Sequence, residues 1–326
     1  MRILIAGHAY EDSRADNVRS ALEEMGHEVR TLSAVSHAWF YNPLRFYSRA
    51  IFERVIRREF ELDGIKLLRI ARNFRPVLVL ALTREYPHEL LEELDRICKP
   101  VKVLWWTDPP GNIRRYGPTE LLWDLVFMKD AVAVQKTRLI RGDVHLLHEA
   151  MNPRWHRPLS SQENEHIAVA GNWYGFRQAL VNRLINDGVE IDCYGSRPPA
   201  WALPMIVKKH KRHYIVREEK SRIFGAALAC LNSFHYGEGD SLNCRAFEIA
   251  GAGGLQLIES RPAVEQCFEP GKELMVFQTY EELLDLIAQT RRDPNGARRI
   301  RAAGAQRALA EHTFRHRLEV ILGYLL

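Results

Sequence analysis

Residues 2–32 read RILIAGHAYEDSRADNVRSALEEMGHEVRTL and contain one complete strand–helix–strand unit. The apolar residues 2–6 predict a strand, and the polar residues 7–12 predict a loop. An amphipathic stretch at 14–25, followed by a glycine, predicts a helix, and 28–32 predicts a second strand. This order of elements is typical of α/β proteins with a parallel sheet.

The same alternation of apolar runs and amphipathic stretches continues along the chain. Further strands of the first half are expected at 77–82, 101–106, 124–127 and 144–148. A polar break at Asn152-Pro153 and at SSQENE (160–165) predicts a linker. Strands of the second half are expected at 166–170, 190–194, 227–232, 254–258 and 275–277. We therefore expect two Rossmann-like α/β domains, 1–158 and 166–312, and a helix at 313–326 that packs back toward the first domain. Ligands of such sheets bind at the carboxyl ends of the strands, here in a cleft between the domains.

The composition indicates a folded protein without a membrane anchor. Of the 326 residues, 46% are hydrophobic and 27% are charged, as in ordinary globular domains. No stretch approaches the ~20 apolar residues of a membrane span, and the apolar run at the start is too short for a signal peptide. The five cysteines are scattered and form no C-x-x-C pair, which predicts reduced thiols and a cytoplasmic location.

The net charge of +5 is concentrated in one segment. Residues 44–75 contain nine Lys or Arg and four Asp or Glu, an excess of five that equals the charge of the whole chain. One interpretation is an ordinary helix with a solvated basic face. The other is a surface that touches anionic lipid or an acidic acceptor, which would place the protein peripherally at the inner face of the membrane.

Several function classes lack their sequence signals. The first strand is followed by G-H-A-Y-E-D, and neither a G-x-G-x-x-G nor a Walker motif occurs, which argues against dehydrogenases and ATPases. The basic run KKHKRH at 208–213 is accompanied by no recognised nucleic-acid-binding fold, so we expect a solvated loop and no nucleic-acid partner.

The segment 232–254, NSFHYGEGDSLNCRAFEIAGAGG, has the pattern of a phosphate site. A strand ends at its start, a glycine-containing loop follows, and a helix begins near 241–243. The N–H groups at a helix start can bind a diphosphate, and Glu248 in that helix could accept the hydroxyls of a ribose. The alternative is that Asp240 or Ser241 caps the helix and that Glu248 is a solvated helix residue. Spacing alone leaves the two interpretations equal.

The residues that follow resemble a known family. N-x-R-A-F-E-I-A-x-A-G-G from Asn243, then F-E-P-G-K-E at 268–273, E-E-L at 281–283 and H-T-F-x-x-R at 312–317 resemble the C-terminal domain of group 1 glycosyltransferases. The closest resemblance is to the spore-maturation-protein-like subgroup. Upstream, Gly171-Asn172 with Arg177, Tyr194-Gly195 and W-W-T-D-P at 105–109 resemble other motifs of that subgroup.

The resemblance implies a GT-B fold and a glycosyltransferase that uses a UDP- or GDP-linked sugar as substrate, with no cofactor and no metal. It implies that Glu248 binds the ribose and that Asp240 faces the donor sugar, where related enzymes have a Glu. Lys220, Arg245 and Arg177 are candidate partners of the phosphates, because a cation neutralises the leaving nucleotide. An alternative role for Arg177 is a salt bridge at a helix end. The expected nucleotide-sugar site consists of Glu248, Arg245, Asn243, Arg177, Asn172, Gly171, Lys220 and Ser241.

In the first domain, Asp108 and His8 are the candidate catalytic residues, and Asp240 joins them from the second. Asp108 follows the fourth expected strand and could orient or deprotonate an acceptor hydroxyl, with Trp105 and Trp106 as a sugar-stacking surface beside it. The alternatives are that Asp108 belongs to a simple turn and that His8 is a solvated loop residue.

The resemblance also implies retention of anomeric configuration, and the acceptor is expected to be a glycan, a lipid-linked molecule or a protein. Two other functions fit the same fold: a nucleotide-sugar epimerase, and a non-catalytic nucleotide-sugar-binding protein of the envelope or spore.

Overall fold

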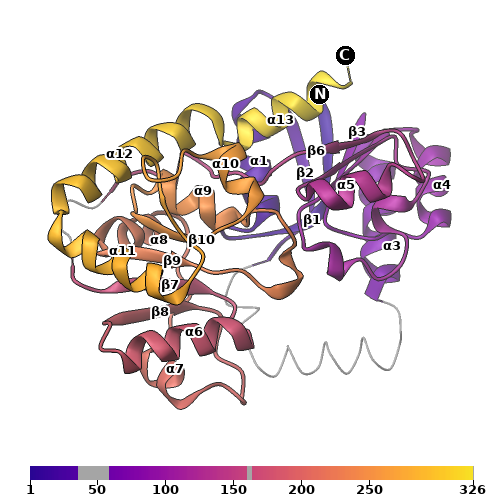
Figure 1. Ribbon diagram of the computed structural model, residues 1–326. Coiled ribbons are helices and arrows are strands. Elements are labelled where there is room, and N and C mark those ends of the chain that lie inside the picture. Colours follow the sequence, from indigo (N-terminus) through magenta and orange to yellow (C-terminus); the bar gives the residue numbers. More distant parts are fainter. Residues whose placement is uncertain (36–58, 160–163, 326) are drawn as a thin grey trace. The chain divides into compact units, whose positions relative to one another are not determined.

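The computed structural model describes residues 1–35, 59–159 and 164–325, and its contacts divide the chain into two units. The first unit contains Met1–His148 together with Leu318–Leu326, and the second contains Glu149–Arg317. Each unit is built on its own parallel sheet with helices packed on it (Figure 1). The expectation of two α/β domains with parallel sheets is therefore confirmed. Residues 160–163 of the expected linker lie outside the described residues.

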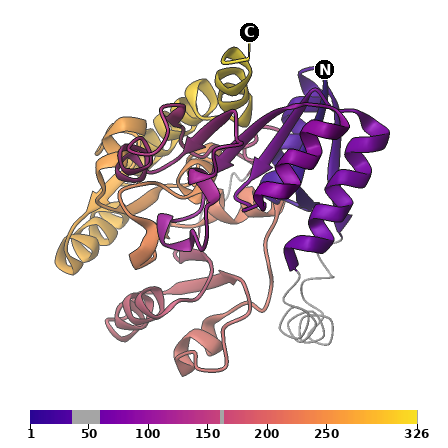
Figure 2. The ribbon, with the colours of Figure 1, turned by 90° about the vertical axis from the view of Figure 1, so that its right-hand side faces the viewer.

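The first sheet has six parallel strands in the order β2-β1-β3-β4-β5-β6. Its strands are β1 (Arg2–Tyr10), β2 (Glu28–Val35), β3 (Leu78–Leu82), β4 (Val101–Trp106), β5 (Leu125–Met128) and β6 (Val144–Leu146). Its helices include α1 (Arg14–Glu24), α3 (Glu59–Phe74), α4 (His88–Ile97) and α5 (Ala131–Thr137). Helices α3 and α4 lie side by side (Figure 2), and their Leu67 and Leu91 join Val79 and Leu104 of the sheet in one core. Uninterrupted apolar strands such as β3, whose residues are all buried, are typical of sheets covered on both faces.

Strand β1 is longer than the sequence predicted. We expected a loop from residue 7, but the pairing with β2 continues through His8↔Ser33 to Tyr10↔Val35, after an irregularity in the register beyond Ile5. Backbone pairing with the neighbouring strand thus outweighs the polar character of these residues. His8 consequently belongs to a strand and not to a loop.

The second sheet has five parallel strands in the order β11-β10-β9-β7-β8. Its strands are β7 (Ile167–Gly171), β8 (Ile191–Gly195), β9 (Ala229–Asn232), β10 (Gln256–Glu259) and β11 (Met275–Phe277). Its helices include α6 (Gly175–Asn186), α7 (Pro204–Lys209), α8 (Arg217–Ala226), α9 (Cys244–Gly251), α10 (Pro262–Cys267), α11 (Tyr280–Arg292) and α12 (Pro294–Glu311). Ala168 and Val169, neighbours in β7, belong to different apolar clusters, because successive strand residues point to opposite faces.

The last helix, α13 (Phe314–Gly323), contains residues of both units. At its start, the backbone of Phe314 donates to the carbonyl of Met151 at 3.0 Å, and both residues belong to the second unit. Near the end of the chain, the Tyr324 hydroxyl lies 3.1 Å from Nδ1 of His145, and both belong to the first unit.

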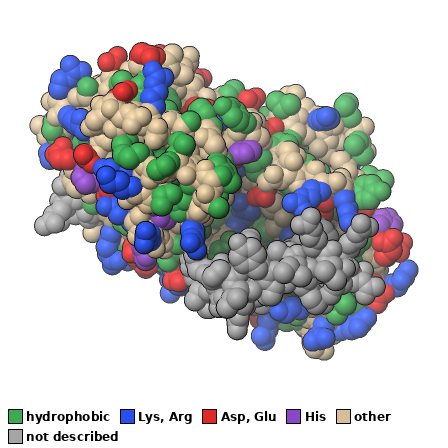
Figure 3. Space-filling model, turned by 90° about the horizontal axis from the view of Figure 1, so that it is seen from below, with side chains coloured by type: hydrophobic (Ala, Val, Ile, Leu, Met, Phe, Trp, Pro, Cys, Tyr) green, Lys and Arg blue, Asp and Glu red, His purple; other side chains and the backbone are tan. Residues whose placement is uncertain are grey.

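On the face seen in Figure 3, Lys and Arg side chains (blue) are spread among acidic ones (red).

Each cysteine is a free thiol, and Cys193, Cys230 and Cys267 are buried. Burial raises the pKa of each of these three thiols to about 12. Within the described residues, no helix is both long enough and apolar enough to cross a bilayer.

Candidate functional site

The carboxyl edge of the second sheet brings two arginines together at a glycine. β7 ends at Gly171, whose φ of 127° is a conformation that favours glycine. A Cβ at this position would lie 2.7 Å from Nη2 of Arg245 and 2.8 Å from Nη1 of Arg177. A side chain at this position would therefore be strained by the backbone conformation and would force both guanidinium groups to move.

Arg177 is held in place by neutral oxygens. Its guanidinium donates to the Asn172 carbonyl at 2.8 Å, to the Ser233 carbonyl at 2.5 Å and to the Ser233 hydroxyl at 3.2 Å. Among the described residues, no carboxylate pairs with Arg177 or Arg245, so the predicted alternative of a salt bridge for Arg177 is wrong. The two positive charges therefore face the same place, and the carboxylates of Glu238 and Glu259 act on Arg177 only from beyond ion-pair distance.

The environment of Arg177 is unfavourable for its charge. The pKa of Arg177 is lowered to about 10, mainly by burial and also by the charge of Arg245, while Tyr174 and the carboxylates of Glu238 and Glu259 oppose this shift. The centre of the Arg177 guanidinium lies 4.5 Å from the centroid of the Tyr174 ring. A bound anion would relieve the electrostatic cost of placing these two positive charges together.

Helix α9 is capped by Asn243 and not by Asp240 or Ser241. The Asn243 side chain accepts from the backbone N–H of Ala246 at 3.2 Å and donates to the Asn232 side chain at 3.0 Å. Ser241 is buried and donates to the Glu238 carbonyl at 2.9 Å. The alternative of a cap at 240 or 241 is therefore wrong, and Asp240 lies exposed in the loop before the helix.

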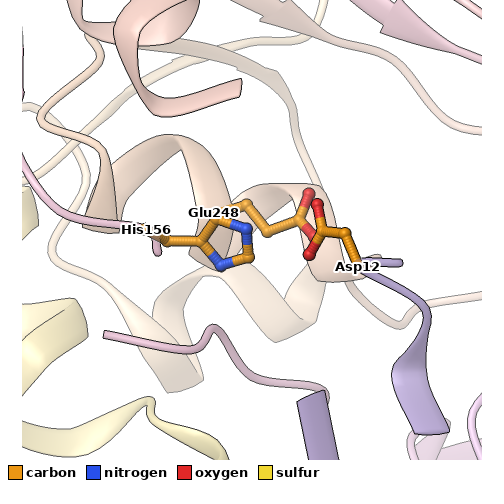
Figure 4. A group of neighbouring side chains, drawn as sticks. All are labelled: Asp12, His156 and Glu248. Atoms are coloured by element: carbon orange, nitrogen blue, oxygen red, sulfur yellow. The ribbon is translucent and has the colours of Figure 1, made fainter. Parts of the chain in front are cut away.

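Glu248 and Lys220 form an ion pair inside the second unit. Glu248 is 6% exposed, so the alternative of a solvated helix residue is wrong. Its Oε1 lies 2.9 Å from Nζ of Lys220 on α8. The side chain of His156 lies beside this carboxyl group (Figure 4), with a ring nitrogen within 4.8 Å of a Glu248 carboxylate oxygen.

Two residues at the end of β10 that were not predicted from the sequence fix the loop after β9. A carboxylate oxygen of Glu259 accepts from the backbone of Phe234 at 3.0 Å. Arg261 donates to the Gly239 carbonyl, and its guanidinium lies 3.9 Å from the Phe234 ring. Their position just at and beyond the carboxyl end of a parallel strand was the available signal.

In the first unit, His8 is bound by an acid that is distant in the sequence. Its Nε2 lies 3.1 Å from both carboxylate oxygens of Asp63 on α3, and Arg84 donates to the same carboxylate. The side chains of His8 and Asp63 are 17% and 13% exposed, so His8 is not a solvated loop residue. A histidine oriented by a carboxylate is suited to general acid–base chemistry. The sequence separation of 55 residues concealed this pair.

Asp108 is accessible, whereas the neighbouring tryptophans are not. Asp108 lies just beyond β4, and its Oδ1 is 3.8 Å from Nη2 of Arg14. Trp105 and Trp106 are buried in the sheet, and Nε1 of Trp105 donates to the Leu147 carbonyl. The expected sugar-stacking surface at these tryptophans is therefore wrong, because β4 is an inner strand whose two faces are both covered.

Two parallel α/β sheets in one chain with this architecture define the GT-B class of glycosyltransferase folds. The structure superposes on sucrose-phosphate synthase from Thermosynechococcus elongatus with a TM-score of 0.67 and 12% identity, over 99% of this chain and 98% of that one. It also superposes on HepE from Anabaena in complex with UDP-glucose, with a TM-score of 0.67 and 10% identity, over 100% of this chain and 99% of that one. A glycosyltransferase from Rickettsia africae gives a TM-score of 0.59 and 10% identity, over 99% and 97% of the chains.

Residues 154–323, more than half of the chain, match the family described as "Glycosyl transferase-like". The chain belongs to this family, and the protein is a glycosyltransferase. No curated protein matches it in sequence.

Proposed function

We propose that the protein transfers a sugar from a UDP- or GDP-linked donor, which the second unit binds by its diphosphate and ribose. The observation that carries this proposal is the meeting of Arg177 and Arg245 at Gly171, two guanidinium groups without a carboxylate partner among the described residues. The diphosphate of a bound donor brings negative charge to the two arginines. When the nucleoside diphosphate leaves, the negative charge that develops on it is stabilised by the same guanidinium groups. Family membership favours transfer over the epimerase and non-catalytic alternatives.

The remaining residues of the nucleotide site follow from this placement of the diphosphate. Glu248, held by Lys220, accepts the ribose hydroxyls. Asp240 lies in the exposed loop before α9 and faces the donor sugar. Asn243 caps the helix, and Asn172 and Ser241 shape the loops at the same edge of the sheet.

We propose that transfer is independent of metal ions and of cofactors. In this site two arginines supply the positive charge that a divalent cation would otherwise bring to the diphosphate. The resemblance to group 1 enzymes supports retention of the anomeric configuration, and the motifs at 243–254 and 312–317 support the spore-maturation-protein-like subgroup.

On the acceptor side, we propose that His8, oriented by Asp63, and Asp108 bind or deprotonate the attacking hydroxyl. His8 and Asp63 share hydrogen bonds, and Asp108 is accessible beyond the end of β4. A glycan or a lipid-linked acceptor is the substrate class we propose.

Membrane contact of the first unit is part of this proposal. The basic segment 44–75 motivated this idea. Its residues up to 58 lie outside the described part of the chain, and Leu67 and Ala71, which belong to α3, are buried in the core. A second surface supports the idea at the end of α5. Leu139 is 87% exposed there, and Ile140 beside it is also exposed, as is Val132 at the start of the helix. Lys136 and Arg138 lie among these residues in the sequence and are exposed too. Apolar side chains interleaved with basic ones suit the surface of an anionic bilayer at the inner face of a membrane.

A thermal-shift screen of UDP-, GDP-, ADP- and dTDP-sugars tests the donor proposal. A ligand that binds only the folded protein raises Tm, by an amount that grows with its concentration over Kd. We expect UDP- or GDP-sugars to raise Tm and ADP-sugars to leave it unchanged. The absence of a shift with every nucleotide sugar at millimolar concentration would contradict the proposal.

A further inference from the structure

Residues 151–157 were expected to end the first domain before a linker, but they are packed on helix α8 of the second unit. The Ser221 hydroxyl donates to the Trp155 carbonyl at 2.9 Å. The Arg217 guanidinium lies over the Trp155 ring, 4.4 Å from its centroid. Helix α8 also carries Lys220, the ion-pair partner of Glu248.

The same segment touches α9, the helix that carries Glu248. A Cβ at Gly251 would lie 3.0 Å from the His156 carbonyl oxygen and 3.2 Å from the end of the Met151 side chain. The segment is therefore anchored on both helices from which the Lys220–Glu248 pair is built. Its side chains are in a position to shape that pair.

The His156 ring is held in place by a hydrogen bond at Nδ1, which leaves Nε2 as its hydrogen-bond donor. It is 1% exposed, and its Nδ1 accepts from the backbone N–H of Asn152 at 3.2 Å. In the neutral ring the proton is therefore on Nε2. Figure 4 shows the ring beside the Glu248 carboxyl group. One of its nitrogens lies within 4.8 Å of a carboxylate oxygen of Glu248.

We propose that His156 is a positioning residue of the nucleotide site: in the nucleotide-bound protein its Nε2–H, which makes no hydrogen bond to Glu248 in this structure, donates to the Glu248 carboxylate and orients it, together with Lys220, to accept ribose hydroxyls. A buried carboxylate takes its orientation from the donors around it. Lys220 can rotate its ammonium group and fixes one oxygen, whereas the imidazole is rigid and fixed by Asn152. The inference rests on the proposed role of Glu248 in ribose binding.

The test is the ratio of two affinities, for UDP and for 2′,3′-dideoxy-UDP, measured by calorimetry on the full chain. A general loss of structure weakens the binding of both ligands equally and leaves the ratio of their affinities unchanged. Loss of the ribose contact weakens UDP alone. If the thermal-shift screen shows that the protein prefers guanine, GDP and its dideoxy analogue replace the uridine pair.

We expect the wild type to prefer UDP by about 10-fold or more, the effect of hydrogen bonds to a charged group. His156→Phe should reduce this preference about 10-fold, and His156→Gln, whose amide retains a donor, should keep it within about threefold. The matched control is His210→Phe. His210 is also a buried histidine of the second unit whose Nδ1 accepts a backbone N–H, from Arg212 at 2.9 Å. It should leave the ratio unchanged.

Glu248→Gln separates this inference from the proposed function. If Glu248→Gln abolishes the preference and His156→Phe does not, the role of His156 is wrong and the nucleotide site stands. If Glu248→Gln keeps the preference, or if the wild type binds neither diphosphate, the proposed nucleotide site is wrong and the inference fails with it.

Discussion

The guanidinium groups of Arg177 and Arg245 meet at Gly171, where a single methyl group would collide with both. The two arginines differ in what else they do. Arg177 is buried and donates to backbone carbonyls of two loops, whereas Arg245 is half-buried. Substitution can therefore distinguish ligand binding from support of the fold.

Arg245→Gln should weaken binding of UDP or GDP about 10-fold while leaving Tm nearly unchanged, because one charged donor to the diphosphate is lost. Arg177→Gln should lower stability as well, by about 1–3 kcal/mol, because the carbonyls of Asn172 and Ser233 lose their donor. Calorimetry and thermal unfolding measure the two effects. Arg183→Gln, on the exposed side of α6, is the control. Equal nucleotide affinity in the wild type and Arg245→Gln would contradict the placement of the diphosphate.

The buried His312 should make the free energy of unfolding depend on pH. It is buried, its Nε2 lies 2.7 Å from the Cys267 carbonyl, and its Nδ1 lies 2.9 Å from Nη2 of Arg317. Burial lowers its pKa from 6.5 to about 4. Between pH 6.5 and 4, His312 is therefore protonated in the unfolded chain but not in the folded chain. The free energy of unfolding consequently falls as the pH is lowered from 6.5 to 4. The contribution is about 3 kcal/mol. Denaturant unfolding at several pH values should show a smaller loss over this window in His312→Gln than in the wild type. Identical pH profiles would show that His312 is not the group responsible.

The pair of His8 and Asp63 should affect turnover and not donor binding. Both residues belong to the first unit, whereas the proposed nucleotide site lies in the second. We expect His8→Gln to lower kcat at least about 100-fold, as for loss of general acid–base catalysis. Asp63→Asn should lower it less, because the histidine remains. Kd for the nucleotide, measured by calorimetry, should stay the same in both variants. An unchanged kcat in His8→Gln would remove His8 from the mechanism.

Chelation should leave the reaction intact. With Arg177 and Arg245 supplying the positive charge at the diphosphate, we expect the rate of transfer in EDTA to equal that in Mg²⁺ or Mn²⁺. Release of the nucleoside diphosphate, followed by chromatography, measures the rate. Activity that disappears in EDTA and returns with a divalent ion would show that metal-independent transfer is wrong.

The surface at the end of α5 should bind vesicles that contain anionic lipid. We expect co-sedimentation at low ionic strength that weakens as salt is added, because each basic residue contributes about 1 kcal/mol and salt screens it. Leu139→Glu combined with Ile140→Glu should reduce the bound fraction several-fold. The control, Leu309→Glu, replaces an exposed leucine on α12 of the second unit and should bind like the wild type. Equal sedimentation with neutral and anionic vesicles would rule out this surface as an anionic-membrane contact.

The sequence predicted the features that depend on local pattern. The strand expected at 101–106 is β4, and that expected at 124–127 is β5, shifted by one residue. It failed where tertiary contacts decide. β1 extends through polar residues because β2 pairs with it, and the two tryptophans of β4 are buried because their strand is an inner one.

The same distinction holds for the candidate site. Glu248 and Lys220 were found as separate candidates, but their ion pair joins two helices and has no sequence signal. His156 was missed because the segment that contains it reads as the approach to a linker. Asp63 was missed because α3 brings it to His8 from 55 positions away.

The thiols described above have a practical consequence for following the enzyme at work. Thiol-directed dyes react with the thiolate, and burial raises the pKa of Cys193, Cys230 and Cys267 to about 12, which keeps thiolate scarce at neutral pH. Burial also raises the pKa of Cys98 and Cys244. A cysteine introduced at the exposed Tyr236, in the loop after β9, would therefore take up a fluorophore ahead of the native five. The natural chain is thus a ready background for an optical sensor of nucleotide-sugar binding.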